Sequence, residues 1–233
     1  MRPASATEVE VALRSVTVWR PDLAPDERYE PLEDLVAGGL AERICARLGG
    51  APLRVGQSAV VMGLTSRLWS VLVVPAFRDR VLPDPAKIVG RDESGSLVLG
   101  LRQLAGGRHP SVDDVARAVQ QVLDPLLAMV PLASRLVWGN AAASLHAVPR
   151  VHGLPAAQAL VDDLLARPPY AGELEVLPSG RARRRTCCLF YLVEDAALCG
   201  DCAFDSIPAR DADPLHGGRR RPPDEAMGDE DER

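Results

Sequence analysis

Residues 56–74 read GQSAVVMGLTSRLWSVLVV and lie in the most apolar part of the chain. This apolar part extends from Ala59 to Phe77, but Arg67 and Pro75 interrupt it. A transmembrane helix needs about 20 consecutive apolar residues, and no uninterrupted part of this stretch is that long. We therefore predict a buried helix over residues 56–74, which Pro75 ends or bends, and no transmembrane segment.

Apolar residues recur at helical spacing on both sides of this stretch, and short apolar runs indicate a few strands. The expected helices cover residues 32–48, 111–126, 131–147 and 154–166, and the expected strands cover 97–101 and 174–177. Ser111 can cap the helix that it begins, and residues 178–180 are an expected turn. Residues 1–30 mix strand-like alternation with a loop rich in Pro and Asp, which suggests a short strand or an irregular arm. The fold class that follows is α+β: a predominantly helical domain with a few short strands and a small C-terminal lobe.

Changes in composition divide the chain into four expected parts. Pro168 and Pro169 end the last helix, and a basic run with clustered cysteines follows it. From about residue 208 the chain has almost no apolar residues, which is typical of disorder. We predict an N-terminal arm (1–30), a helical domain (31–170), a C-terminal lobe (171–207) and a disordered tail (208–233).

Composition and charge exclude some classes of protein. Hydrophobic residues make up 47% of the chain and charged residues 25%, so disorder over the whole chain is excluded. The formal net charge of −5 argues against a nucleic-acid partner. The polar start of the chain has no apolar core of a signal peptide, so we expect a cytoplasmic, reducing location.

Four of the five cysteines lie close together, in the stretch TCCLFYLVEDAALCGDC at residues 186–202. In a reducing compartment such clusters more often bind metal than form disulfides. Their spacing, C-C-x10-C-x2-C, gives four candidate metal ligands, which are Cys187, Cys188, Cys199 and Cys202. The fifth, Cys45, lies beside an apolar helical stripe and is interpreted as a core residue.

The adjacent pair restricts the kind of metal site. On a regular strand Cys187 and Cys188 would point to opposite faces, so the backbone must turn there unless two metals share the ligands. Zinc sites typically use two chelating pairs separated by two to four residues, which the adjacent pair does not fit. The spacing therefore favours a [2Fe–2S] cluster, with zinc or unliganded or disulfide-forming thiols as alternatives.

The cysteine motif, with basic residues before it and Leu-Phe-Tyr inside it, resembles the C-terminal [2Fe–2S] motif of the FhuF-like ferric-siderophore reductases. The sequence WGNAA at residues 138–142 is similar to the helical region of that family. The resemblance implies a [2Fe–2S] cofactor on the four cysteines and one-electron reduction of siderophore-bound Fe(III) to Fe(II) in the cytoplasm. The implied partners are a ferric siderophore of the hydroxamate type and an electron donor, either a ferredoxin or an NAD(P)H-linked flavoprotein.

Aromatic, amide and guanidinium groups could contact such an organic iron complex. The candidate substrate-binding residues are Arg67, Trp69, Arg135, Trp138, Asn140 and Arg184. The alternative for the tryptophans and Asn140 is ordinary core packing, and for the basic run around Arg184 a solvated strand. No catalytic residue beyond the cluster is expected. The alternative functions are a zinc-stabilised interaction module and another one-electron [2Fe–2S] carrier or sensor.

Overall fold

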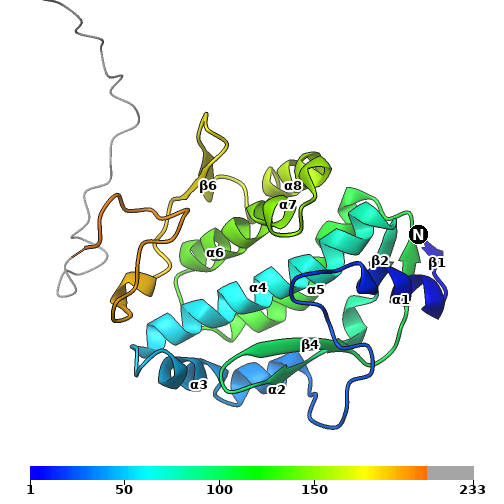
Figure 1. Cartoon of the computed structure of the whole chain (residues 1–233), viewed down its shortest axis with the longest axis horizontal. Helices are drawn as coiled ribbons and strands as arrows, with labels where there is room; N and C mark the ends of the chain where they lie inside the picture. Colours follow the sequence, from blue (N-terminus) through cyan, green and yellow to red (C-terminus); the bar gives the residue numbers. More distant parts are fainter. Residues whose placement is uncertain (209–233) are drawn as a thin grey trace, which may run out of the picture.

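The computed structural model describes residues 1–208, and helices dominate it (Figure 1). The α-helices are α1 (Ala6–Arg14), α2 (Leu32–Ala37), α3 (Leu40–Arg47), α4 (Leu53–Arg78), α5 (Val112–Ala128), α6 (Ser134–His146), α7 (Val148–Val151) and α8 (Gln158–Leu165). Three short 3-10 helices are η1 (Pro85–Lys87), η2 (Pro155–Ala157) and η3 (Phe190–Leu192). The predicted tail lies almost wholly outside the described residues.

The strands are short and form three small antiparallel sheets. They are β1 (Arg2–Pro3), β2 (Val81–Pro83), β3 (Ile88–Asp92), β4 (Leu97–Leu101), β5 (Gly106–Arg108), β6 (Leu174–Val176) and β7 (Ala182–Arg184). The first sheet has the order β1-β5-β2, while β3 pairs with β4 and β6 pairs with β7. The α+β class with few short strands is confirmed, as is the strand at residues 97–101.

Helix α4 runs through the middle of the molecule (Figure 1), where it contacts α3, α5, α6 and β2. Most of its apolar residues are buried and form much of the main hydrophobic core. By length and composition alone α4 could cross a membrane, but 72% of its most apolar window is buried inside the protein. The prediction of a buried helix is therefore confirmed.

Three expectations about helices need correction. Residues 6–14 form a helix and not a strand, because Ser5 and Glu8 make a reciprocal capping box at its start. The single helix expected over residues 32–48 is two helices, since Gly38 and Gly39 separate them and Gly39 has a φ of +88°. Helix α4 continues past Pro75 to Arg78, so this proline does not end it.

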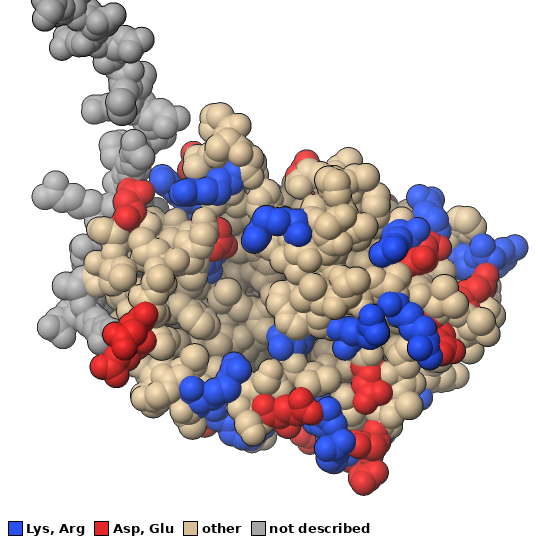
Figure 2. All heavy atoms as spheres, in the orientation of Figure 1, with Lys and Arg blue, Asp and Glu red and all other residues tan. Residues whose placement is uncertain are grey.

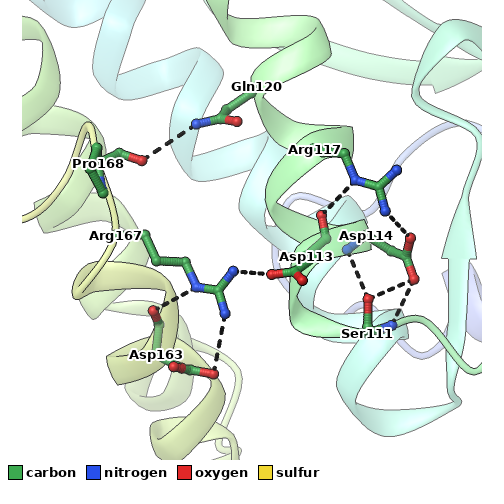
Figure 3. Close-up of polar contacts among 8 residues, drawn as sticks. All are labelled: Ser111, Asp113, Asp114, Arg117, Gln120, Asp163, Arg167 and Pro168. Carbon is green, nitrogen blue, oxygen red and sulfur yellow. Dashed lines mark hydrogen bonds and ion pairs between the residues drawn. The ribbon is translucent and has the colours of Figure 1, made fainter.

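Polar contacts join α5 to the chain that follows α8 (Figure 3). Arg167, just after α8, forms ion pairs with Asp113 on α5 and with Asp163 on α8. Ser111 accepts a hydrogen bond from the Asp114 backbone and caps α5, as the sequence predicts. A cavity of about 480 Å³ lies between these two elements, and none of the predicted site residues lines it.

The C-terminal lobe, residues 171–207, packs against the end of the helical body formed by α6 and α4 (Figure 1). It begins with the β6–β7 hairpin, whose turn at residues 178–180 agrees with the sequence prediction. Thr186 donates a hydrogen bond of 3.0 Å to the carbonyl oxygen of Arg135 at the start of α6. A Cβ atom on Gly139 would lie 2.4 Å from Thr186 Oγ1, so only glycine permits this close approach.

Candidate metal centre

Strand β7 leads directly into the first two cysteines, and the chain then returns to place the other two beside them. The Arg184 backbone N–H donates a hydrogen bond of 2.9 Å to the carbonyl oxygen of Asp201. This contact joins the end of the hairpin to the turn between Cys199 and Cys202. Two segments whose contacting residues are 17 positions apart along the chain are therefore fixed side by side.

The backbone turns sharply just after the adjacent cysteines. Leu189 has a φ of +69°, which is uncommon for a residue other than glycine, and its N–H donates a hydrogen bond of 3.3 Å to Cys187 Sγ. Cys188 Sγ then lies 3.3 Å from Cys199 Sγ. The backbone thus turns just after the adjacent pair, and Cys188 lies beside the second cysteine segment.

The second segment is also a turn. The Cys202 backbone N–H donates a hydrogen bond of 3.1 Å to the carbonyl oxygen of Cys199, and the Phe204 N–H donates one of 3.4 Å to Cys202 Sγ. Backbone N–H groups directed at sulfur stabilise thiolates, which are the form of cysteine that binds metal. One such donor is present in each cysteine segment.

The thiols influence each other electrostatically. The pKa of Cys188 is lowered because Cys187 and Cys199 hydrogen-bond to its sulfur, and the positive charge of Arg184 adds to this effect. The pKa of Cys187 is raised by the hydrogen bond to Cys188 and by burial, with a smaller contribution from Cys202. Cys187 therefore lies within reach of the charges of Cys188 and Cys202, and Cys188 contacts both Cys187 and Cys199.

The four thiols supply the donor set that a [2Fe–2S] cluster needs. Within residues 1–208, no three His, Cys, Asp or Glu side chains are arranged to hold one metal ion. A structural zinc ion would gather all four sulfurs around itself at about 2.3 Å, whereas a [2Fe–2S] cluster divides four thiolates between two metals. Four neighbouring thiols with N–H groups on their sulfurs suit the second arrangement.

A buried chain of polar groups ties the cysteines to the helical body. Ser58 on α4 donates a hydrogen bond of 2.7 Å to the carbonyl oxygen of Cys188 and accepts one of 2.9 Å from the Asn140 amide. The Asn140 carbonyl oxygen accepts a hydrogen bond of 2.8 Å from the Arg184 guanidinium, which is also paired with Asp201. Ser58, Asn140 and Arg184 are all fully buried.

Arg184 is the cation of this network. Burial alone would lower the pKa of its guanidinium, but the negative charges of Cys188, Asp201 and Cys199 raise it above its ordinary value. The side chain is entirely buried, so the alternative of a solvated basic strand does not hold for this residue. Its neighbours Arg183 and Arg185 do reach the surface.

The structure scatters the other predicted substrate residues. Trp69 and Asn140 are fully buried, and the Trp69 indole N–H donates a hydrogen bond to the carbonyl oxygen of Ala141. Trp138 packs edge-on against Tyr170 with ring centroids 5.8 Å apart. This is the core packing that the sequence left as an alternative, and a role in substrate binding stays a prediction for these residues.

The two predicted arginines on the helices have different surroundings. Arg67 lies over the Trp19 ring and donates hydrogen bonds to the carbonyl oxygens of Leu97 and Gly63. The cavity that it lines has a volume of about 50 Å³, which is too small for an organic iron complex. The side chain of Arg135, in contrast, is 59% exposed and lies 3.7 Å from Glu173 in the C-terminal lobe.

Exposed positive charge gathers where the lobe meets the body. Figure 2 shows a hollow between the C-terminal lobe and the helical body, with Lys and Arg side chains over the β6–β7 hairpin and on the body beside it, together with Asp or Glu side chains at its edge. Arg135 and Arg185 are both exposed: Arg185 precedes Thr186 in the chain, and the Arg135 carbonyl oxygen accepts a hydrogen bond from the Thr186 hydroxyl, one residue before Cys187. The local surface can therefore attract an anionic group towards the cysteines.

Sequence reasoning missed Ser58, Asp201 and Thr186. Ser58 is a polar residue within the most apolar helix, and a buried hydroxyl there needs a partner. That was the available signal, although the sequence could not show that the partner is the carbonyl oxygen of Cys188, 130 residues away. Asp201 lies between two predicted ligands, but Asp is also common in turns, so the sequence alone did not indicate that its carboxylate pairs with a buried arginine.

Comparison with known proteins identifies the cysteine segment. Residues 184–204 match the FhuF 2Fe–2S C-terminal domain, and the matched stretch begins at Arg184 and contains all four clustered cysteines. The rest of the chain lies outside this match, and the chain matches no curated protein. The resemblance to FhuF-like proteins is thus confirmed for this segment, and it supports a [2Fe–2S] cluster as the cofactor.

Proposed function

We propose that this protein is a cytoplasmic ferric-siderophore reductase, which transfers one electron to siderophore-bound Fe(III) and releases Fe(II). The observation that carries the proposal is the match of residues 184–204 to a FhuF 2Fe–2S domain. The surroundings of this segment, a helical body with exposed arginines close to Cys187, suit a protein that receives a bulky complex rich in oxygen acceptors. The division into an arm, a helical domain and a lobe that carries the cluster belongs to the same proposal.

Cys187, Cys188, Cys199 and Cys202 are the proposed ligands of the cluster. The contact between Cys188 and Cys199 and the N–H groups on the sulfurs of Cys187 and Cys202 support this assignment. When bound, a [2Fe–2S] cluster supplies one electron at a time, which is what reduction of Fe(III) to Fe(II) consumes. The electron comes from a ferredoxin or an NAD(P)H-linked flavoprotein.

In this proposal the side chains of the protein bind and orient the substrate, and a bound cluster would supply the electron that reduces its iron. Siderophores hold ferric iron through hard oxygen donors, which suit ferrous iron far less well, so reduction loosens the iron. Arg135 is the predicted substrate residue that remains exposed beside the cysteine segment, and Arg185 adds a second exposed cation there. We propose that these two arginines donate hydrogen bonds to oxygen atoms of the ferric complex and hold it in the hollow seen in Figure 2.

An anaerobic single-turnover assay tests this proposal. The purified protein is reduced, freed of excess reductant and mixed with a ferric hydroxamate siderophore and a ferrous chelator that traps the product. We expect trapped Fe(II) to appear together with reoxidation of the cluster, and a Cys199→Ser variant to give none. Reduced, cluster-loaded protein that yields no more Fe(II) than this variant would contradict the proposal.

The same assay separates the second candidate function. A one-electron carrier or sensor with the same cluster would be reoxidised by small electron acceptors but not by ferric siderophores. The four-thiol segment fits both functions. The two are therefore distinguished by whether a ferric siderophore reoxidises the reduced cluster. Exposed Arg135 favours the reductase because it places a cation next to the cysteine segment.

A further inference from the structure

Among residues 1–208, Arg184 is the charged residue whose side chain is entirely buried. This buried side chain interacts with both cysteine segments, with Asp201 in one and with Cys188 in the other. Its guanidinium lies 3.0 Å from each carboxylate oxygen of Asp201, between Cys199 and Cys202. The charges of Cys188 and Cys199 also act on it directly. A buried cation of this kind persists only where its partners are fixed around it.

The same guanidinium connects the cysteines to the helical body. It donates to Asn140 on α6, and the Asn140 amide donates to Ser58 on α4, which donates to the carbonyl oxygen of Cys188. The path therefore starts beside one cysteine segment and ends on the backbone of the other. Arginine suits this place because its planar fork makes several hydrogen bonds at fixed angles and keeps its charge at any physiological pH.

We infer that Arg184 is the positioning residue of the cluster: it holds the two cysteine segments in register on the body and supplies a fixed positive charge beside Cys188 and Cys199. The inference rests on the cluster in the proposed function and not on the substrate. Groups that orient metal ligands from outside the metal's own shell commonly change metal affinity by about 10- to 100-fold. Nearby charge also sets the reduction potential of an iron–sulfur cluster.

The two roles of Arg184 are separable by substitution. Arg184→Gln removes the charge and keeps a hydrogen-bonding group, while Arg184→Lys keeps the charge and loses the fork. Ser58→Ala leaves Arg184 intact and removes only the link from the body to Cys188. Arg183→Gln is the matched control, because Arg183 is the adjacent arginine and pairs with Asp205 at the surface.

Two measurements on the iron-loaded full chain distinguish the positioning role of Arg184 from its role as a positive charge, and neither needs a siderophore. They are the reduction potential by spectroelectrochemistry and the half-life of the visible absorption after addition of an iron chelator. We expect Arg184→Gln to have a lower potential than the parent, because loss of a positive charge disfavours the added electron. We expect Arg184→Lys to keep nearly the parent potential but to lose the cluster about tenfold faster, since its fork is gone.

Ser58→Ala should keep the parent potential and also release its iron about tenfold faster, which keeps the inference testable if Arg184→Gln loads no cluster. Arg183→Gln should match the parent in both measurements. The inference fails if Arg184→Gln has the potential and half-life of Arg183→Gln, or if Ser58→Ala retains its iron like the parent. A parent protein without iron would instead contradict the proposed function, so the two failures are distinguishable.

Discussion

Helix α4 and the C-terminal lobe are held together by different forces. Buried apolar side chains such as Leu64, Leu68 and Leu72 join α4 to its neighbours in the main core. The fully buried residues of the lobe, which are Ala182, Arg184, Cys188, Leu189 and Tyr191, are outside that core. Apolar burial therefore stabilises the body, while the lobe relies on polar contacts and, in the proposed function, on a metal cluster held by its thiols.

This difference predicts that the two regions fail independently. Loss of the metal should loosen the lobe and leave the body folded, and a cavity in the body should lower its stability without changing the cluster. Substitutions confined to the body or to the lobe test whether the two regions are independent. Substitutions at the contact between them should affect both.

The largest effect is expected from loss of one proposed ligand. Cys199→Ser should reduce the iron content to near zero, and amide hydrogens of residues 187–204 should then exchange almost as in an unfolded chain. The amides of α4 should stay protected. Iron analysis and hydrogen exchange of the purified variant check both parts.

Cys45 provides the matched control for this prediction. It is buried where α3 packs on α4, and its thiol contacts the carbonyl oxygen of Pro52 and not the lobe. Cys45→Ser should keep the parent iron content. Equal iron loss in both variants would show that the cluster depends on overall stability and not on the four clustered thiols.

The next effect concerns the body alone. Leu68 is fully buried on α4, and Leu68→Ala should lower the free energy of unfolding by about 2–5 kcal/mol because it leaves a cavity. The visible spectrum of the folded variant should equal that of the parent, since Leu68 is a member of the body's core. Urea unfolding followed by far-UV circular dichroism measures the first quantity. A folded variant that has lost its visible absorption would contradict the separation of the two regions.

A smaller effect is expected at the contact between the two regions, where the change in unfolding free energy caused by one substitution should reverse its sign with the background. Gly139→Ala places a Cβ 2.4 Å from Thr186 Oγ1 and should destabilise the protein by about 1–3 kcal/mol through this clash. In a Thr186→Ala background that oxygen is gone, and the same substitution should stabilise α6 by up to about 1 kcal/mol, because alanine favours a helix over glycine.

A double-mutant cycle on unfolding free energies measures this coupling. If Gly139→Ala has the same effect in both backgrounds, Thr186 is not what approaches α6 there, and the close contact of lobe and body is refuted.

The smallest effect is a pH dependence of the body. His152 lies 2.8 Å from Ser70 on α4, measured from its Nε2 to the serine Oγ, and burial lowers its pKa below 6.5. As the pH falls below 6.5, the unfolded chain takes up a proton that the folded protein resists, so stability present above this pH is lost. His152→Gln keeps an amide near Ser70 and does not titrate. Its urea midpoint should depend less on pH between 7 and about 5, and an unchanged dependence would refute the assignment.

The sequence predicted those features that local patterns determine. The apolar run around residues 56–74 indicated the central helix, and the spacing of the cysteines indicated the cofactor. Ser111 marked the start of α5 by its capping position. These features depend on periodicity, capping or spacing, which a single sequence carries.

Features that depend on distant contacts could not be predicted in the same way. The burial of Arg184 depends on its hydrogen bond to Asn140, which lies 44 residues earlier in the chain. Asn140 in turn depends on Ser58, which lies 82 residues before Asn140. The basic run around Arg184 looks alike at all its positions, yet the structure buries one member and exposes others. Gly38 and Gly39 did carry a local signal for the helix break, but the apolar periodicity on both sides concealed it.

The central claim is that the four clustered thiols hold a [2Fe–2S] cluster. Iron and acid-labile sulfide analysis of anaerobically purified protein, combined with an EPR spectrum of its dithionite-reduced form, tests this claim most directly. We expect about two irons and about two sulfides per chain, with a one-electron signal that appears on reduction. Colourless protein with stoichiometric zinc, no acid-labile sulfide and no signal after reduction would contradict it.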